Sequence, residues 1–154
     1  MPSVQTDRGL FHGRGCDMSV EEKAVSYHRA GFNCAQSVLC SCGAYTGLDE
    51  KTALAVSGGL GGGFRCGEIC GALSGAVLAA GLCCPYNDAA DRAAKEEIAQ
   101  LTRRLTELFR ERFGEVRCEK LKGDGSRCNE YIAFMAETCE NTFQQLQNSN
   151  TTGE

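Results

Sequence analysis

Apolar residues recur at helical spacing through most of this chain, and no segment alternates apolar and polar residues over the length of a strand. The clearest helix begins after Asp88 or Asp91, and its apolar stripe consists of Ala94, Ile98, Leu101, Leu105 and Leu108. Gly114 is its natural end, because glycine readily adopts the left-handed conformation that closes many helices. The pattern predicts an all-α fold, a single-domain bundle of about five to seven helices.

Capping residues predict where further helices begin. The expected starts are Ser19 with Glu22 as a capping box, Asn33 for a helix to about Tyr45, Asp49 for one to about Ser57, and Ser126 for the last helix. We expect the helical domain to occupy residues 17–147, with flexible, polar termini at 1–16 and 148–154.

The most apolar helix, expected over about residues 67–82, carries small residues at every fourth position: Gly67, Gly71, Gly75 and Ala79. Such a ridge lets another helix backbone approach closely. We therefore expect this helix to be the central element of the bundle. The close partner is either another helix of the same chain or a second copy in a homodimer.

Composition excludes several classes of function. The net charge of -4, the absence of a Lys or Arg block and the absence of tryptophan argue against a nucleic-acid partner. The first 15 residues contain no apolar core of a signal peptide, and the apolar run at 69–84 is too short and interrupted to be a transmembrane segment. We expect a cytoplasmic protein, where the 11 cysteines stay reduced and serve as metal ligands, redox thiols or small buried side chains.

Four of the cysteines fall at expected helix starts: Cys34, Cys70, Cys118 and Cys128. Unpaired backbone N–H groups and the helix dipole lower the pKa of a thiol there, which favours the reactive thiolate. We expect this effect at Cys34, Cys70 and Cys128 in particular. Arg117 and Arg127, directly before two of the cysteines, would add to it slightly.

The positions of the remaining cysteines give no indication of reactivity. Late or mid-helix placement predicts buried, unreactive side chains for Cys40, Cys42, Cys83, Cys84 and Cys139. Cys16 lies in a terminus, and Cys66 could share a face with Cys70. The sequence leaves the roles of Cys66, Cys83 and Cys84 open.

Several familiar site patterns are missing. There is no C-x-x-C pair, and only His28 with Cys34 could form a Cys–His pair, which we discount. The glycine cluster at 58–63 lacks the Lys of a phosphate-binding loop. Gly67 and Gly71 are weak candidates for backbone contact with a cofactor or anion, and close packing is the better interpretation of both.

Three stretches of the chain, residues 31–38, 58–63 and 67–76, resemble the family named for its cysteine pattern, C_GCAxxG_C_C, as do Phe113–Cys118 and Cys128 after them. The resemblance runs in order from about residue 20 to 146. It implies a helical, redox-active protein with four characteristic cysteines. Carried over to this chain, they are Cys34, Cys70, Cys118 and Cys128.

The leading hypothesis is therefore a redox-active protein in which these four cysteines converge, as exchanging thiols or as ligands of an iron–sulfur cluster. The alternatives are a structural Cys₄ zinc site and a helical interaction module with inert cysteines. The sequence identifies no substrate or redox partner. It also leaves open whether the protein is an enzyme, that is, a thiol- or cluster-based oxidoreductase or electron carrier.

Overall fold

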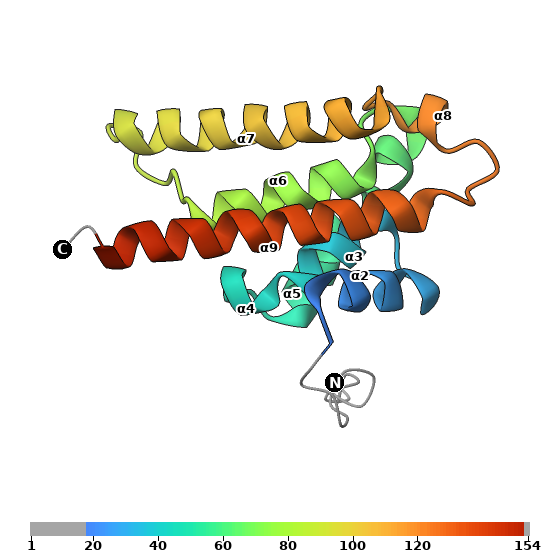
Figure 1. Cartoon of the computed structure of the whole chain (residues 1–154), viewed down its shortest axis with the longest axis horizontal. Helices are drawn as coiled ribbons and strands as arrows, with labels where there is room; N and C mark the ends of the chain where they lie inside the picture. Colours follow the sequence, from blue (N-terminus) through green and yellow to red (C-terminus); the bar gives the residue numbers. More distant parts are fainter. Residues whose placement is uncertain (1–17, 153–154) are drawn as a thin grey trace.

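The computed structural model describes residues 18–152, and within them helices joined by short turns and loops make up the fold (Figure 1). The helices are α2 (Val20–Arg29), α3 (Cys34–Ser41), α4 (Gly43–Thr46), α5 (Glu50–Ser57), the π-helical turn η1 (Gly63–Gly67), α6 (Gly71–Cys83), α7 (Arg92–Phe113), α8 (Cys118–Leu121) and α9 (Cys128–Thr152). In this part of the chain the only β pairing is an isolated antiparallel bridge between Ile69 and Arg117. The predicted all-α fold is confirmed.

Helix α6 lies at the centre of the bundle, as its small-residue ridge predicts. It contacts α3 and α4 on one side and α7 on the other, and α9 runs beside it (Figure 1). The core between these helices includes Leu105 and Phe109 of α7 and Ile132, Met135 and Phe143 of α9, all almost fully buried. Between residues 18 and 152 no helix has both the length and the apolar character to cross a membrane.

Most of the predicted capping residues lie at the helix ends where they were expected. Ser19 accepts a hydrogen bond from the N–H of Glu22 at 3.1 Å, and the carboxylate of Glu22 accepts one from the N–H of Ser19 at 3.0 Å. Asp49 and Asp91 cap α5 and α7. Gly114 ends α7 with a φ of 78°, the conformation expected of it.

Other boundaries differ from the expectation. The helix expected from Asn33 to Tyr45 is divided into α3 and α4 at Cys42. Helix α6 begins at Gly71 rather than near residue 67, because Gly67 has a φ of 82° and Glu68 and Cys70 have ψ angles of -138° and 130°, which a regular helix excludes.

Two further differences concern the last helix. Helix α9 begins at Cys128, since Ser126 lies in the preceding turn, where its N–H donates to the side chain of Asp124 at 2.9 Å. The helix then continues to Thr152, past the domain end expected at residue 147. Cys16, His12 and the expected flexible segment at 1–16 lie outside the described residues.

The contact between α3 and α6 is closer than side chains would allow. A Cβ atom at Gly75 would lie 2.6 Å from the carbonyl oxygen of Ala35, and one at Gly71 would lie 3.0 Å from the Cβ of Cys34. The small-residue ridge therefore packs within the chain, against the first turn of α3. This contact sets Cys34 directly over the start of α6.

Replacing Gly75 with alanine tests this packing. We expect Gly75→Ala to lower the free energy of unfolding by about 1–3 kcal/mol, since the backbone of α3 must move away. The matched control is Gly81→Ala in the same helix, where a Cβ atom would meet nothing within 4 Å. The control should stabilise the protein by about 0.5 kcal/mol. Urea denaturation of the two variants checks both values, and equal effects would contradict the packing.

Candidate functional site

Four cysteines from four helix starts come together in the structure: Cys34, Cys70, Cys118 and Cys128. The thiol of Cys34 is hydrogen-bonded to that of Cys128 and is close enough to Cys70 and Cys118 for their charges to affect it. Cys70 is similarly affected by Cys118 and Cys128, and Cys118 by Cys128. All pairs within the set therefore interact. We call this set the four-cysteine cluster.

The isolated β-bridge joins two members of the cluster. Cys70 caps the start of α6, and its N–H donates to the carbonyl of Val116 at 2.8 Å. The N–H of Cys118, the first residue of α8, donates in return to the carbonyl of Glu68 at 2.6 Å. Cys70 and Cys118 thus lie at the same end of the Ile69–Arg117 pair.

Cys34 is held by the capping box at the start of α3. The side chain of Asn33 accepts a hydrogen bond from the N–H of Gln36 at 2.9 Å and donates one to the carbonyl of Gly58 at 3.0 Å. Gln36 donates to the carbonyl of Leu54 at 3.0 Å. These bonds fix the first turn of α3 against α5 and the glycine turn that follows it.

Cys128 opens α9, and two side-chain contacts position this helix start. The hydroxyl of Tyr131 donates to the carbonyl of Leu121 at 2.9 Å, which ties α9 to α8. Nδ1 of His28, in the last turn of α2, lies 2.7 Å from Oδ1 of Asn129. Because an amide oxygen only accepts, Nδ1 carries the proton and donates to Asn129.

The cluster has an inner and an outer half. Cys70 and Cys118 are buried, with 4% and 9% of their surface exposed. Cys34 and Cys128 are only half-buried. The hydrogen-bonded pair is therefore the half that solvent and partners reach first.

Cys128 is the cluster member whose thiolate is stabilised. The hydrogen bond from the Cys34 thiol, with the nearby charges of His28 and Lys122, lowers the pKa of Cys128 to about 6. The same hydrogen bond, together with burial, raises the pKa of Cys34 well above its usual value. At neutral pH the pair thus holds one thiolate and one thiol.

The prediction of a lowered pKa is supported for Cys128 but wrong for Cys34 and Cys70. Burial raises the pKa of Cys70 to about 11, although the N–H groups of Ala72 and Leu73 act in the opposite direction. Burial also raises the pKa of Cys118. Loss of hydration therefore outweighs the helix N-terminus at these buried positions.

The two arginines next to the cluster are engaged elsewhere. Arg117 forms an ion pair with Glu119 at 2.8 Å and lies 3.9 Å from Glu68. Arg127 pairs with Glu130 at 2.9 Å. The side chains whose electrostatic effect lowers the pKa of Cys128 are instead His28, which the sequence analysis paired only with Cys34 and then discounted, and Lys122. Nothing in the sequence spacing indicates that the end of α2 reaches α9.

The six other cysteines between residues 18 and 152 differ in how deeply they are buried. Cys42, Cys84 and Cys139 are buried, as predicted, and burial raises the pKa of Cys40 to about 12. Burial and a contact with Glu97 raise the pKa of Cys84. Cys66 is exposed, and its thiol lies 3.5 Å from the carbonyl of Gly63.

Gly67 and Gly71 face protein atoms. A Cβ atom at Gly67 would lie 2.9 Å from the Cβ of Glu119, and the space above Gly71 is taken by Cys34. Within residues 18–152, no three His, Cys, Asp or Glu side chains are arranged to hold a single metal ion.

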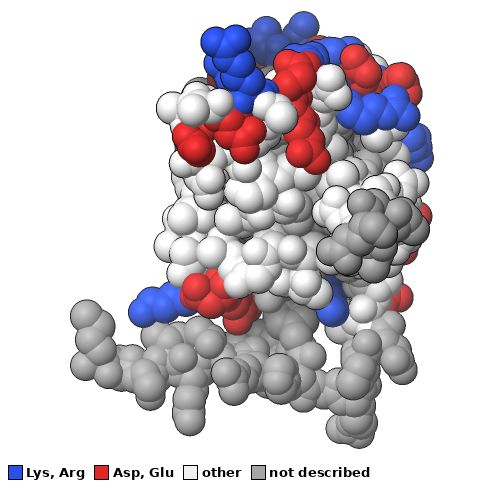
Figure 2. Space-filling model, turned by 90° about the vertical axis from the view of Figure 1, so that its left-hand side faces the viewer, with Lys and Arg blue, Asp and Glu red and all other residues white. Residues whose placement is uncertain are grey.

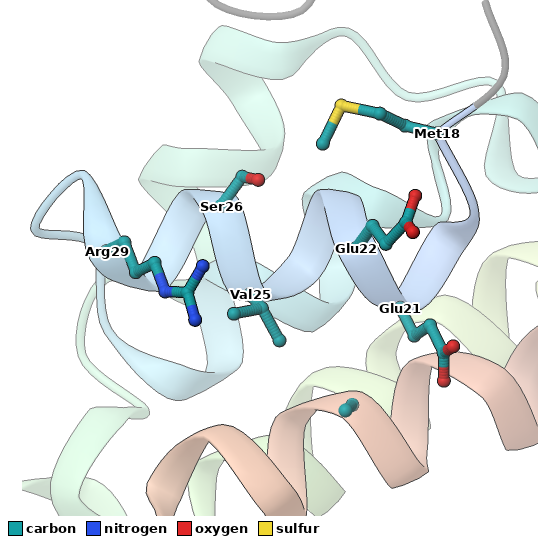
Figure 3. A pocket seen from close by; sticks show the side chains of 7 residues that line it. Met18, Glu21, Glu22, Val25, Ser26 and Arg29 are labelled. Atoms are coloured by element: carbon teal, nitrogen blue, oxygen red, sulfur yellow. The ribbon is translucent and has the colours of Figure 1, made fainter. Parts of the chain in front are cut away.

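A groove of about 470 Å³ between α2 and α9 contains no cysteine (Figure 3). Its lining residues are Met18, Glu21, Glu22, Val25, Ser26, Arg29 and Ala133.

The hydrogen bond between Cys34 and Cys128 should determine the pH at which Cys128 becomes reactive toward an alkylating reagent. Alkylation of Cys128 in the reduced protein should be half-maximal near pH 6, and that of Cys70 near pH 11. Cys34→Ala, which removes the donor, should raise the midpoint of Cys128 by about 1–3 pH units. Cys34→Ser keeps a hydroxyl donor and should raise it less. Mass spectrometry across a pH series gives each midpoint, and an unchanged midpoint in Cys34→Ala would refute the pairing.

Comparison with known proteins finds one family that covers most of the chain. A family model described as "Putative redox-active protein (C_GCAxxG_C_C)" matches residues 32–142, which is well over half of the chain and contains the four-cysteine cluster. Comparison with curated proteins and with solved structures finds no match. On the strength of the family model, the chain belongs to the C_GCAxxG_C_C family.

Proposed function

We propose that the four-cysteine cluster is a thiol–disulfide redox site in which Cys34 and Cys128 are the exchanging pair. The observation that carries the proposal is the direct contact of these two thiols, one of which is stabilised as a thiolate. A dithiol that exchanges with a partner needs an accessible thiolate and a second thiol within bonding reach. The half-buried pair meets both requirements.

The proposed reaction begins at Cys128. Its thiolate attacks one sulfur of a partner disulfide, which forms a mixed disulfide and releases the first partner thiolate. The Cys34 thiol then loses its proton to solvent and attacks the sulfur of Cys128, which releases the second partner thiolate. Two protein thiols are oxidised to a Cys34–Cys128 disulfide, and the partner disulfide is reduced to two thiols.

The inner pair has a supporting role in this scheme. Cys70 and Cys118 are buried and have raised pKa values, so they are poor nucleophiles at neutral pH. They lie within electrostatic reach of the outer pair, which supports their receiving the disulfide by internal exchange. The cluster would then store up to four electrons as two disulfides.

An iron–sulfur cluster is the second candidate, and the observation in its favour is the mutual approach of all four thiols. Four thiolates are the ligand set that such clusters use, and Cys34, Cys70, Cys118 and Cys128 would hold it. The bound cluster would supply one-electron transfer. A structural zinc ion would use the same thiols without redox chemistry, but they would have to move closer together, since no three of them in the described residues are arranged to hold a single metal ion.

Single-turnover reduction of hydroxyethyl disulfide tests the dithiol reaction. One equivalent of reduced protein should release two equivalents of mercaptoethanol at pH 7 and gain a Cys34–Cys128 disulfide. Cys128→Ser should slow this at least about 100-fold, because it removes the thiolate. Cys34→Ser should stop at a mixed disulfide on Cys128. The exposed Cys66→Ser is the matched control and should react at the wild-type rate.

Protein purified without oxygen distinguishes the candidates. The dithiol proposal expects colourless protein with neither iron nor zinc at stoichiometric level. Iron and acid-labile sulfide at stoichiometric level, lost in Cys70→Ser but not in Cys66→Ser, would replace the proposal with a cluster. Stoichiometric zinc in colourless protein that does not reduce the disulfide would replace it with a structural site.

A further inference from the structure

A second group of cysteines lies apart from the four-cysteine cluster. It consists of Cys42 at the junction of α3 and α4, Cys83 at the end of α6, and Cys139 in the middle of α9. Cys42 and Cys139 are fully buried, whereas Cys83 is partly exposed. None of the three is in the set carried over from the family pattern. We call them the second thiol group.

The three thiols belong to one part of the core, since Cys42 and Cys139 lie in the same buried cluster and Cys83 packs against that cluster. The thiol of Cys139 is hydrogen-bonded to that of Cys42, and the charge of Cys83 also acts on it. Of the other thiols, Cys42 has the largest effect on Cys83. The group is therefore a hydrogen-bonded buried pair with the more accessible Cys83 within electrostatic reach of both.

Cys83 is the member that faces the surface. It lines a pocket of about 150 Å³ formed with Tyr45 of α4 and with Phe143 and Leu146 of α9. Its thiol lies 3.6 Å from the carbonyl oxygen of Tyr45. Figure 2 views the end of the molecule where α6 and α9 finish, and uncharged side chains cover most of its middle, with charged ones gathered above over α7. The pocket beside Cys83 is thus lined by uncharged side chains, which suits a small uncharged disulfide.

We propose that the second thiol group is a separate dithiol–disulfide site, which reacts with small-molecule disulfides at Cys83 and stores the oxidation as a disulfide between Cys42 and Cys139. The proposal does not depend on the function of the four-cysteine cluster. Its product would link α3 covalently to α9, two helices that pack against each other in the core.

The reaction balances in three exchanges. The Cys83 thiolate attacks the small disulfide, which forms a mixed disulfide and releases one small thiolate. Cys42 gives its proton to the small thiolate just released, attacks the sulfur of Cys83 and displaces the second small thiolate. Cys139 then attacks the sulfur of Cys42, which forms the Cys42–Cys139 disulfide, and its proton passes to the displaced sulfur of Cys83, which returns as a thiol. Two protein thiols are oxidised, and one small disulfide is reduced to two thiols.

The surroundings of Cys83 make this site slow at neutral pH. The titratable groups that face it are the thiols of Cys42, Cys84 and Cys139 and the phenol of Tyr45, which lines the same pocket. Burial, Cys42 and Cys84 raise the pKa of Cys83 to about 11. The thiolate fraction, and with it the rate of attack, should therefore rise about 100-fold from pH 7 to pH 9. Cys128 is already ionised over that range, so the two sites respond differently to pH.

Peptide mapping of the oxidised full-length chain tests the proposal. Reduced protein is treated with excess hydroxyethyl disulfide at pH 9, quenched with acid at intervals, and its disulfides are assigned to residues by mass spectrometry. We expect a mixed disulfide at Cys83 first and a Cys42–Cys139 disulfide later. Cys83→Ser should slow the second product at least tenfold. Cys84→Ser, the adjacent residue at the same helix end, is the matched control and should leave it unchanged.

Several results would overturn the proposal. A reaction that stops at the mixed disulfide of Cys83, or that yields a Cys83–Cys84 disulfide, would show that the buried pair takes no part. A Cys42–Cys139 disulfide that forms equally fast in Cys83→Ser would remove the role of Cys83. If circular dichroism shows Cys83→Ser to be unfolded, the wild-type chain decides whether Cys83 takes part. A Cys42–Cys139 disulfide that appears before the mixed disulfide of Cys83 would then contradict the proposal. Peptide mapping distinguishes a Cys34–Cys128 disulfide from a Cys42–Cys139 disulfide. The absence of one product is therefore recognised whether or not the other one forms.

Discussion

The contact of α3 with α6 is the constraint on which the four-cysteine cluster depends. Gly71 and Gly75 leave no room for side chains, so the backbone of Ala35 packs directly on α6. This approach places Cys34 over the start of α6, beside Cys70. The hydrogen bonds of the Ile69–Arg117 bridge then bring Cys118 to Cys70, and the bond from Tyr131 to Leu121 holds the start of α9 beside α8. Glycine costs helix stability, and the close approach that it permits offsets that cost here.

Within the cluster, burial and hydrogen bonding compete for control of each thiol. All four cysteines lie at or next to a helix N-terminus, where unpaired N–H groups favour a thiolate. Only Cys128 has a lowered pKa, because it gains a thiol donor from Cys34 and two cationic neighbours while staying half-buried. Backbone hydrogen bonds lower the pKa of Cys70, but the loss of hydration raises it by more. The same local position therefore gives opposite reactivity at different depths.

The four-cysteine cluster and the second thiol group differ in accessibility and in the pKa of their accessible thiol. The four-cysteine cluster has an accessible, ionised member, whereas the second thiol group has a partly exposed member with a raised pKa and two fully buried ones. The difference follows from burial and hydrogen bonding, since Cys128 gains a thiol donor while it stays half-buried, whereas burial is the main cause of the raised pKa of Cys83. Both groups bridge several helices, so oxidation at either would cross-link elements that only tertiary packing brings together.

The sequence by itself determined the fold class, most helix starts and the four cysteines at or beside helix N-termini, because periodicity and caps are local properties of the chain. Ser19, Asn33 and Asp49 cap the predicted helices, and Gly114 ends α7. Tertiary structure decided which thiol is ionised and which thiols meet. His28 and Cys128 are 100 positions apart in the printed sequence and face each other only because α2 packs on α9. Likewise Cys42, Cys83 and Cys139 carry no local signal, since their contact and burial arise from three helices at once, and the degree of dehydration that sets each pKa is known only when the chain is folded.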